Sequence, residues 1–312
     1  MLDNSLKKMR ENISRVVIGK EEILDLLTVG LLAQGHILIE DVPGVGKTLL
    51  AKTLAASLNC GFRRLQFTPD LTPSDVTGFF VFDRQTNEFS YRPGPVHTNI
   101  LLVDEINRGI PRTQSSLLEA MEERQVTVEG ETFPLPCPFF VLATQNPIEL
   151  EGTFPLPEAQ LDRFILKIKM GYPTTQEEEL IIATHGQNRP LDDLQAVGGK
   201  EDVLSWQEQC RKVFVDPTVT RYIITLSRAT RSHPKLSLGA SPRASLALYR
   251  AACALALVRG RDFVLPDDVK YLAPFVLEHR LIPSRQERLR GNSGAAVLHE
   301  ILENVPVSLE GA

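Results

Sequence analysis

Short apolar runs alternate with helical patterns in the first half of the chain. The runs lie at 36–40, 63–67, 99–104, 139–144 and 164–169. Most are rich in Ile, Leu, Val and Phe and lack polar alternation, which is typical of strands buried on both faces of a parallel sheet. Helical patterns at 48–58 and 112–124 separate them. Strands that alternate with helices predict a doubly wound α/β layer.

Two insertions interrupt this rhythm, and each has the pattern of a β-hairpin. In the first, at 79–92, Phe89 and Tyr91 alternate with polar residues after a polar turn. In the second, at 125–135, apolar residues alternate on both sides of a turn that contains Gly130. Alternation around a short turn predicts two antiparallel strands. Surface decoration without a function is an equally good interpretation of both hairpins.

The strand-like runs stop after residue 173. Helical patterns follow at 177–184, 205–213, 217–229, 242–258 and 266–271. Ser241 before Pro242 is a typical helix start, because serine caps the first turn and proline suits its first position. We expect a domain boundary near residue 172, with an α/β domain at 1–172 and an all-helical domain at 173–312.

Composition and charge narrow the class of protein. The chain has 312 residues and a net charge of −5 with both signs mixed, so no basic stripe favours nucleic acid or a membrane surface. The most apolar stretch, 244–258, is interrupted by Arg250 and is too short to insert into a membrane. Four dispersed cysteines favour thiols in a reducing compartment. We expect a soluble, cytoplasmic protein.

The clearest candidate for chemistry follows the first apolar run. The sequence there is Asp41-Val42-Pro43-Gly44-Val45-Gly46-Lys47-Thr48, followed by a helical pattern that begins at Leu49. A strand, a glycine-containing loop and a helix in this order predict a phosphate-binding loop. Gly44 and Gly46 would let the backbone approach a phosphate, Lys47 would neutralise the outer phosphates, and Thr48 would offer its hydroxyl to Mg²⁺. The predicted nucleotide-binding residues here are Pro43, Gly44, Val45, Gly46, Lys47, Thr48 and Leu49.

The loop departs from the usual motif at Asp41, where the first glycine normally stands. Aspartate tolerates left-handed backbone better than most residues, so we expect the turn to remain feasible. A tight strand–helix turn with a surface lysine is the less favoured alternative.

Polar residues also follow two later strands. Asp104 and Glu105 end the run at 99–104, and Asn146 follows the run at 139–144. Carboxyl ends of parallel strands form the crevice in which such sheets bind ligands. We expect Asp104 to hold Mg²⁺ through its water and Glu105 to polarise the attacking water. Asn146 precedes a proline and could simply form a turn, but a contact with the γ-phosphate or the lytic water is favoured.

Taken together, these motifs resemble the AAA+ superfamily, and more narrowly its MoxR family. The resemblance rests on the segments 41–48, 102–108, 143–147 and, most specifically, 151–164 (EGTFPLPEAQLDRF). It implies a sheet of order 5-1-4-3-2 with two hairpin inserts, followed by an all-α lid over the nucleotide. The order of the strands is an expectation from the family and not from the spacing of the runs.

The resemblance also assigns roles to single residues. Asn146 matches the sensor-1 position, Arg163 the arginine finger and Arg243 the sensor-2 position. Val17 and Ile18 resemble the segment that packs against adenine. Without the resemblance, Arg163 and Arg243 would be interpreted as solvated surface side chains.

The implied function is an ATP-driven, chaperone-like ATPase that matures or remodels protein complexes, including insertion of metal cofactors. Such proteins form homo-oligomers, commonly hexameric rings, and the hairpins would face the pore or the axial surface. The implied partners are a separate protein with a von Willebrand factor A domain and an unknown client. Two alternatives remain open, an ATPase subunit like that of magnesium chelatase and a scaffold that binds nucleotide without hydrolysis. A helicase, and nucleic acid as a partner, are disfavoured.

Overall fold

The computed structural model describes residues 4–85, 87–147 and 152–307. Thr86, in the turn of the first predicted hairpin, and Glu151, at the start of the segment most specific to the family, lie outside these ranges.

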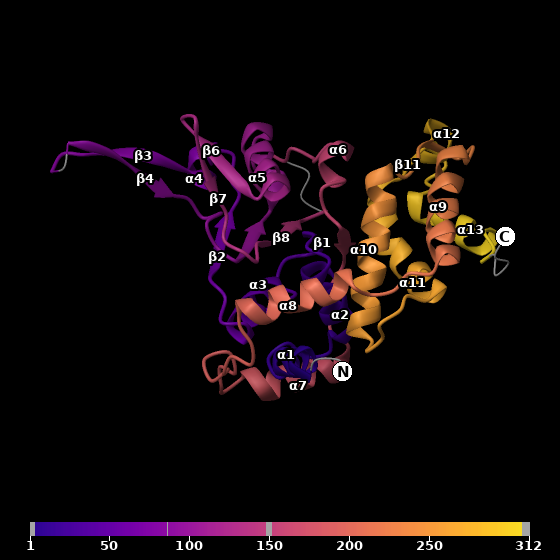
Figure 1. Cartoon of the computed structure of the whole chain (residues 1–312), viewed down its shortest axis with the longest axis horizontal. Helices are drawn as coiled ribbons and strands as arrows, with labels where there is room; N and C mark the ends of the chain where they lie inside the picture. Colours follow the sequence, from indigo (N-terminus) through magenta and orange to yellow (C-terminus); the bar gives the residue numbers. More distant parts are fainter. Residues whose placement is uncertain (1–3, 86, 148–151, 308–312) are drawn as a thin grey trace.

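Five parallel strands form the central sheet (Figure 1). They are β1 (Ile37–Glu40), β2 (Phe62–Gln66), β5 (Ile100–Asp104), β8 (Phe140–Gln145) and β9 (Leu166–Ile168). Their order is β2-β5-β8-β1-β9, and each neighbouring pair is parallel. Numbered along the chain and read from the β9 edge, this is 5-1-4-3-2. The predicted strands and the order implied by the family are therefore confirmed.

Helices cover both faces of this sheet. Alternate strand residues such as Ile37 and Ile39 enter one core with α1 (Asn4–Ser14), α2 (Glu21–Leu32) and α3 (Lys47–Ser57). Leu38, between them, enters a second core with α5 (Pro111–Glu123). Because side chains alternate across a strand, an uninterrupted apolar run supplies both cores at once. A short helix, α4 (Pro73–Thr77), packs against α5.

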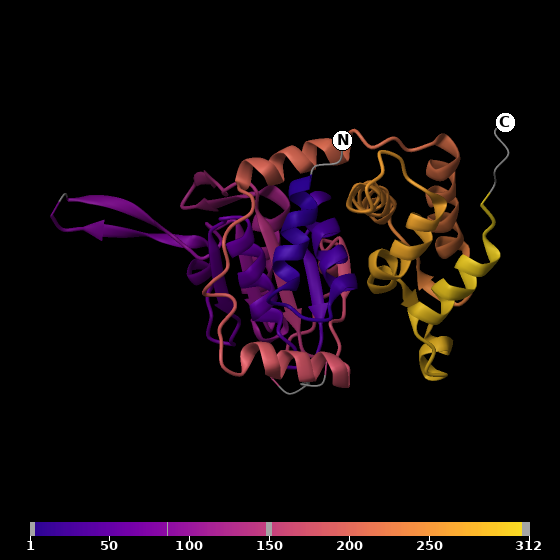
Figure 2. The same ribbon diagram turned by 90° about the horizontal axis from the view of Figure 1, so that it is seen from below.

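Both predicted hairpins are present. The first pairs β3 (Gly78–Asp83) with β4 (Glu88–Pro93) and projects far from the body of the protein (Figures 1 and 2). The second pairs β6 (Gln125–Val128) with β7 (Glu131–Pro134). The two meet at the base of the first hairpin, where the Tyr91 ring stacks on that of Phe133 at 4.0 Å. The inserts are therefore joined by side-chain packing.

The chain after residue 172 is mainly helical. Its helices are α7 (Thr175–His185), α8 (Lys200–Arg211), α9 (Pro217–Ser232), α10 (Pro242–Val258), α11 (Pro266–Leu277), α12 (Arg285–Leu289) and α13 (Gly294–Asn304). The prediction of a purely helical segment missed one antiparallel ribbon, β10 (Leu236–Leu238) with β11 (Ile282–Pro283). These strands are too short to leave an alternating pattern in the sequence.

The later helices fall into two groups in space. Helices α7 and α8 lie along the α/β core, whereas α9 to α13 form a separate bundle, in which α10 is on the side of the core (Figures 1 and 2). Helix α8 packs against both α2 and α10. The domain boundary near residue 172 therefore stays a prediction. Within the described ranges, no helix has the length and apolarity required to cross a bilayer.

Candidate functional site

The phosphate-binding loop connects the end of β1 to the start of α3. Gly44 and Gly46 adopt φ values of 86° and 93°, in the left-handed region that favours glycine. A Cβ atom at either position would meet nothing within 4 Å. The backbone conformation, and not lack of space, therefore requires glycine here. Helix α3 begins at Lys47, so its N-terminal amides face the loop, as an anion site requires.

Asp41 acts through its side chain and not through its backbone. Its φ is not positive, so Asp41 does not adopt the left-handed conformation that the sequence analysis considered. Tolerance of that conformation therefore does not explain why aspartate fits this position. Its buried carboxylate accepts hydrogen bonds from the amides of Val42, at 2.8 Å, and Gly171, at 2.6 Å. The aspartate thereby ties the start of the loop to the segment that follows β9.

Lys47 lies among oxygen atoms. Its Nζ donates to the carbonyl oxygens of Asp41, at 2.9 Å, and Val42, at 3.1 Å. Partial burial lowers the pKa of Lys47, and the carboxylates of Asp41, Asp104 and Glu105 oppose this effect. The Lys47 ammonium group therefore lies beside the loop, and the three nearby carboxylates favour its charged form.

Asp104 ends β5 and is nearly buried. Its Oδ2 lies 2.5 Å from Nε of Arg64, on β2, and its Oδ1 accepts from the Thr144 hydroxyl, on β8, at 3.2 Å. Arg64 was not among the predicted site residues. Strand β2 pairs with β5 so that Gln66 is opposite Asp104. Arg64 is two residues before Gln66 on the same strand, and this pairing brings its side chain to Asp104.

Glu105 has a strained backbone, with φ at 55°, a conformation that is unusual for a residue with a side chain. Its amide donates to the Thr144 hydroxyl at 2.9 Å. Its Oε2 accepts from the side chains of Gln66, at 2.7 Å, and Arg108, at 3.1 Å. Sequence reasoning missed both partners. Gln66 lies two residues from Arg64 and so shares its face of β2, and neither residue was predicted to lie at the site.

These side chains line one pocket of about 340 Å³ at the carboxyl edge of the sheet. Strands β1, β5 and β8 are neighbours in the sheet, so the loop and the residues after the two later strands meet. The predicted residues found here are Pro43, Gly44, Gly46, Lys47, Thr48, Leu49, Asp104, Glu105 and Asn146. The unpredicted ones are Arg64, Gln66 and Thr144.

A second pocket, of about 450 Å³, shares Gly44, Gly46 and Leu49 with the first. The remaining predicted residues Val17, Ile18 and Val45 line it, together with Tyr172 and His185, which were not predicted. A ring nitrogen of His185 lies 2.9 Å from the Val16 carbonyl oxygen, which holds α7 against this segment. An apolar pocket next to a phosphate loop suits the base of a nucleotide.

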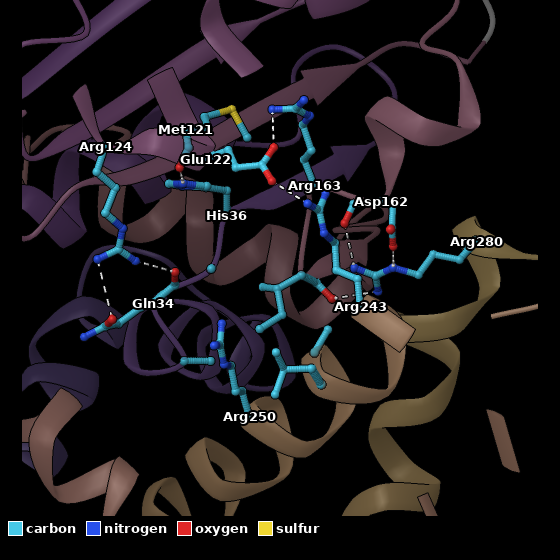
Figure 3. Close-up of a pocket in the computed structure, with 15 residues that line it drawn as sticks. Gln34, His36, Met121, Glu122, Arg124, Asp162, Arg163, Arg243, Arg250 and Arg280 are labelled. Atoms are coloured by element: carbon cyan, nitrogen blue, oxygen red, sulfur yellow. Dashed lines mark hydrogen bonds and ion pairs between the residues drawn. The ribbon is translucent and has the colours of Figure 1, made fainter. Parts of the chain in front are cut away.

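Arg163 and Arg243 line neither of these pockets. They meet instead in a third pocket, of about 260 Å³, beside α5 and α10 (Figure 3). Arg163 Nη1 lies 2.5 Å from Oε2 of Glu122, and Arg243 donates to the other oxygen of the same carboxylate. The structure thus separates the two arginines from the phosphate loop of their own chain.

The oxygen donors Thr48 and Asp104 fit Mg²⁺ that arrives with a nucleotide. Within the described ranges, no group of three or more His, Cys, Asp or Glu side chains could hold a metal ion without other ligands. Mg²⁺ commonly binds one or two protein oxygens together with phosphate oxygens and water. Both residues line the pocket of the phosphate loop, so two protein oxygens are present for this kind of Mg²⁺ coordination.

Comparison with known proteins identifies relatives over nearly the whole chain. Residues 36–166 match the "ATPase family associated with various cellular activities (AAA)", and residues 228–301 match an AAA lid domain. The chain is 50% identical to the uncharacterized protein YeaC of Bacillus subtilis, over 98% of this chain and 95% of that one. It is 43% identical to the chaperone MoxR1 of Mycobacterium tuberculosis, over 97% and 82%. A crystal structure of a candidate ATPase from Cytophaga hutchinsonii has a TM-score of 0.92 and 39% identity, covering 98% and 95%.

Proposed function

Because this chain belongs to the MoxR family of AAA+ ATPases, we propose that it hydrolyses ATP with Mg²⁺ to remodel or mature protein complexes. One observation carries the proposal. Lys47 and Thr48 at the loop, and Asp104 and Glu105 after a different strand, line a single pocket. A binding loop and a carboxylate placed for water activation are the two parts that phosphoryl transfer to water requires.

The loop and Lys47 bind the phosphates. Backbone amides at the start of α3 and the Lys47 ammonium neutralise their negative charge. Thr48 and Asp104 would hold Mg²⁺, which supplies further neutralisation of the phosphate oxygens. Arg64, which is paired with Asp104, must then share that carboxylate or release it.

Glu105 orients and polarises the attacking water. Gln66 and Arg108 both donate to Oε2 of its carboxylate, so the other oxygen can accept the proton of the water. Asn146 lines the same pocket and would position the γ-phosphate or that water. The base would lie against Val17 and Ile18 in the adjoining apolar pocket.

Arg163 would complete the site of a neighbouring protomer in a homo-oligomeric ring, which the family resemblance implies is a hexamer. Its separation from the phosphate loop of its own chain supports this assignment. A cation that meets the departing phosphoryl group lowers the barrier more than it aids ATP binding. Arg243 shares Glu122 with Arg163 and would therefore act at the same place.

The projecting hairpin would face the pore or the axial surface of the ring, where it would contact the client. Phe79, Phe82 and Phe89 are exposed on it. Exposed aromatic rings on a protruding element suit contact with another protein. The client, a partner with a von Willebrand factor A domain and any inserted metal cofactor remain expectations from the family. A cytoplasmic location fits its four free cysteines.

Phosphate release from ATP by the purified protein tests this function. We expect Mg²⁺-dependent turnover that Lys47→Ala abolishes together with binding of a fluorescent ATP analogue. Glu105→Gln should retain binding and lose turnover, because an amide cannot act as the base. Nucleotide binding without phosphate release in the wild-type protein would instead favour a scaffold that does not hydrolyse ATP.

A further inference from the structure

Glu122 connects two arginines that come from distant parts of the chain. Glu122 lies near the end of α5, Arg163 follows α6 (Glu158–Leu161), and Arg243 is in the first turn of α10. Each oxygen of the Glu122 carboxylate forms an ion pair with one arginine, as Figure 3 shows. We propose that Glu122 is a positioning residue that makes these two arginines one paired donor for the phosphoryl group of the neighbouring protomer's ATP. The inference rests on the proposed function and extends it to a residue outside the predicted site.

Glu122 holds each arginine by only part of its guanidinium group. Arg163 uses Nη1 for Glu122 and, at 2.8 Å, for the carbonyl oxygen of Leu118, whereas Arg243 uses Nη2. Across the described part of the chain, neither guanidinium has another hydrogen bond or ion pair. A guanidinium carries five N–H donors, so most donors of both groups are available to a ligand. Glu122 can therefore stay bound while the arginines contact a phosphoryl group.

The charges around the pair favour an anion with several oxygens. Two guanidinium groups at one carboxylate leave a local charge of +1, and without Glu122 the two would repel each other. The residues with ionic side chains that line the pocket are Arg124, Arg163, Arg243, Arg250, Arg280, Glu122 and Asp162. The positive excess and the planar donors match a phosphoryl group, whose oxygens accept from more than one arginine.

A buried contact already fixes the segments that carry the two arginines. Arg280, whose side chain is 3% exposed, lies 2.6 Å from the Asp162 carboxylate. The Ser241 hydroxyl donates to the other oxygen of Asp162 at 3.2 Å. Asp162 precedes Arg163, and Ser241 is two residues before Arg243. The Asp162 carboxylate thus links the two segments through the side chain of Ser241, and Glu122 links the guanidinium groups of their arginines.

Steady-state ATPase kinetics of Glu122→Gln test the role. The amide has one acceptor oxygen and no charge, so it cannot hold both guanidinium groups. We expect kcat to fall by about tenfold to a hundredfold, as loss of an orienting contact often does, while KM for ATP stays unchanged. Glu122→Asp should recover part of the loss. Glu123→Gln is the matched control, because Glu123 is the next residue on α5 and is exposed.

Mixtures of variants test whether Glu122 acts through the two arginines. Glu122→Gln retains its own Lys47 pocket, so adding Lys47→Ala protomers, which have intact arginines, should raise turnover. Adding Arg163→Ala protomers should not, because both variants lack the pair. The proposal would be overturned if Arg163→Ala protomers restored the turnover of Glu122→Gln. It would also be overturned if KM for ATP rose in Glu122→Gln by the same factor as kcat fell.

Chemical labelling tests the pairing without using catalysis. Phenylglyoxal modifies accessible guanidinium groups, and mass spectrometry locates the modified arginines. Arg163 and Arg243 should both react faster in Glu122→Gln than in the wild-type protein, and the Glu123→Gln control should match the wild type. Unchanged labelling would overturn the pairing. Absence of ATP turnover in the wild-type protein would refute the proposed function instead, and the labelling result would still decide whether Glu122 holds the pair.

Discussion

Nε of Arg64 lies 2.5 Å from Oδ2 of Asp104, the carboxylate that would serve Mg²⁺. The Arg64 side chain is 52% exposed, whereas that of Asp104 is 10% exposed. A flexible cation from an edge strand thus occupies one oxygen of a carboxylate that is fixed in the sheet. Arginine and Mg²⁺ must compete for this oxygen, because two cations at one acceptor repel each other.

Arg64→Ala should therefore lower the Mg²⁺ concentration at which a fluorescent ATP analogue is half bound. Removing a nearby cation frees Asp104 for the metal, without altering the phosphate loop. Titration of Mg²⁺ at a fixed analogue concentration measures the effect, with Lys52→Ala, an exposed residue of α3, as the control. A higher Mg²⁺ requirement in Arg64→Ala would mean that Arg64 binds the phosphates and does not compete with the metal.

The aromatic residues of the first hairpin divide into two groups with different expected effects. Phe82 and Phe89 are exposed and pair across the strands at 5.2 Å. Replacing both with alanine should spare stability and basal ATPase and weaken client action. Thermal melting and phosphate release check the first two, and binding of a client protein checks the third. Lower basal ATPase with an unchanged melting temperature would contradict the prediction that these two rings act only on the client.

Tyr91 belongs to the base of the hairpin, although it alternates with Phe89 in the sequence. Its ring stacks on Phe133, and its hydroxyl donates to the Thr77 carbonyl oxygen at 2.5 Å and lies 2.8 Å from His97. Tyr91→Ala should lower the free energy of unfolding by about 2–3 kcal/mol, near the lower end for large aromatic truncations because the ring is only partly buried. Urea unfolding measures it, and an unchanged midpoint would show that the Tyr91 ring does not stabilise the fold.

His36 should make stability depend on pH in the acidic range. Burial lowers its pKa to about 4, and the contact with the Met121 carbonyl oxygen only partly opposes this shift. The neutral ring accepts a hydrogen bond from the Val141 amide. The unfolded value is about 6.5. Between these values the unfolded chain binds the proton and the folded chain does not, so stability falls as pH decreases from 6.5 towards 4.

His36→Gln should flatten this dependence, because glutamine can accept and donate at the same two partners without titrating. We expect the wild-type protein to lose about 2–3 kcal/mol more than the variant between pH 6.5 and 4.5. Urea unfolding at several pH values measures the difference. Parallel curves for the two proteins would show that His36 contributes nothing to the acid sensitivity.

Much of the fold could be predicted because the relevant signals are local. The uninterrupted apolar runs indicated the parallel strands, and Ser241 with Pro242 marked the start of α10. Helices α1 and α2 were not predicted from the pattern, although α2 is buried along most of its length. Because α2 is apolar on most of its sides, it has little periodicity to reveal it.

The site was predictable where a motif or a strand end marked it, and unpredictable where side chains meet only in the folded chain. Lys47 and Asp104 share a pocket because parallel strands align their carboxyl ends. Arg64 has no such mark, since an arginine on an edge strand is ordinarily solvated. Glu122 and Arg243 are 121 residues apart, and no local pattern relates them.

Mixtures of Lys47→Ala and Arg163→Ala provide the most direct test that ATP is hydrolysed at a site completed by a neighbouring protomer. Each variant alone should be nearly inactive in phosphate release. In mixed rings, an Arg163→Ala pocket can meet the intact arginine of a Lys47→Ala neighbour, so turnover should rise well above that of either variant. Lys47→Ala mixed with Glu105→Gln is the control and should stay inactive, because both lack a working pocket. If native mass spectrometry confirms mixed rings and turnover still does not rise, Arg163 does not act across the interface, and the account of the site is wrong.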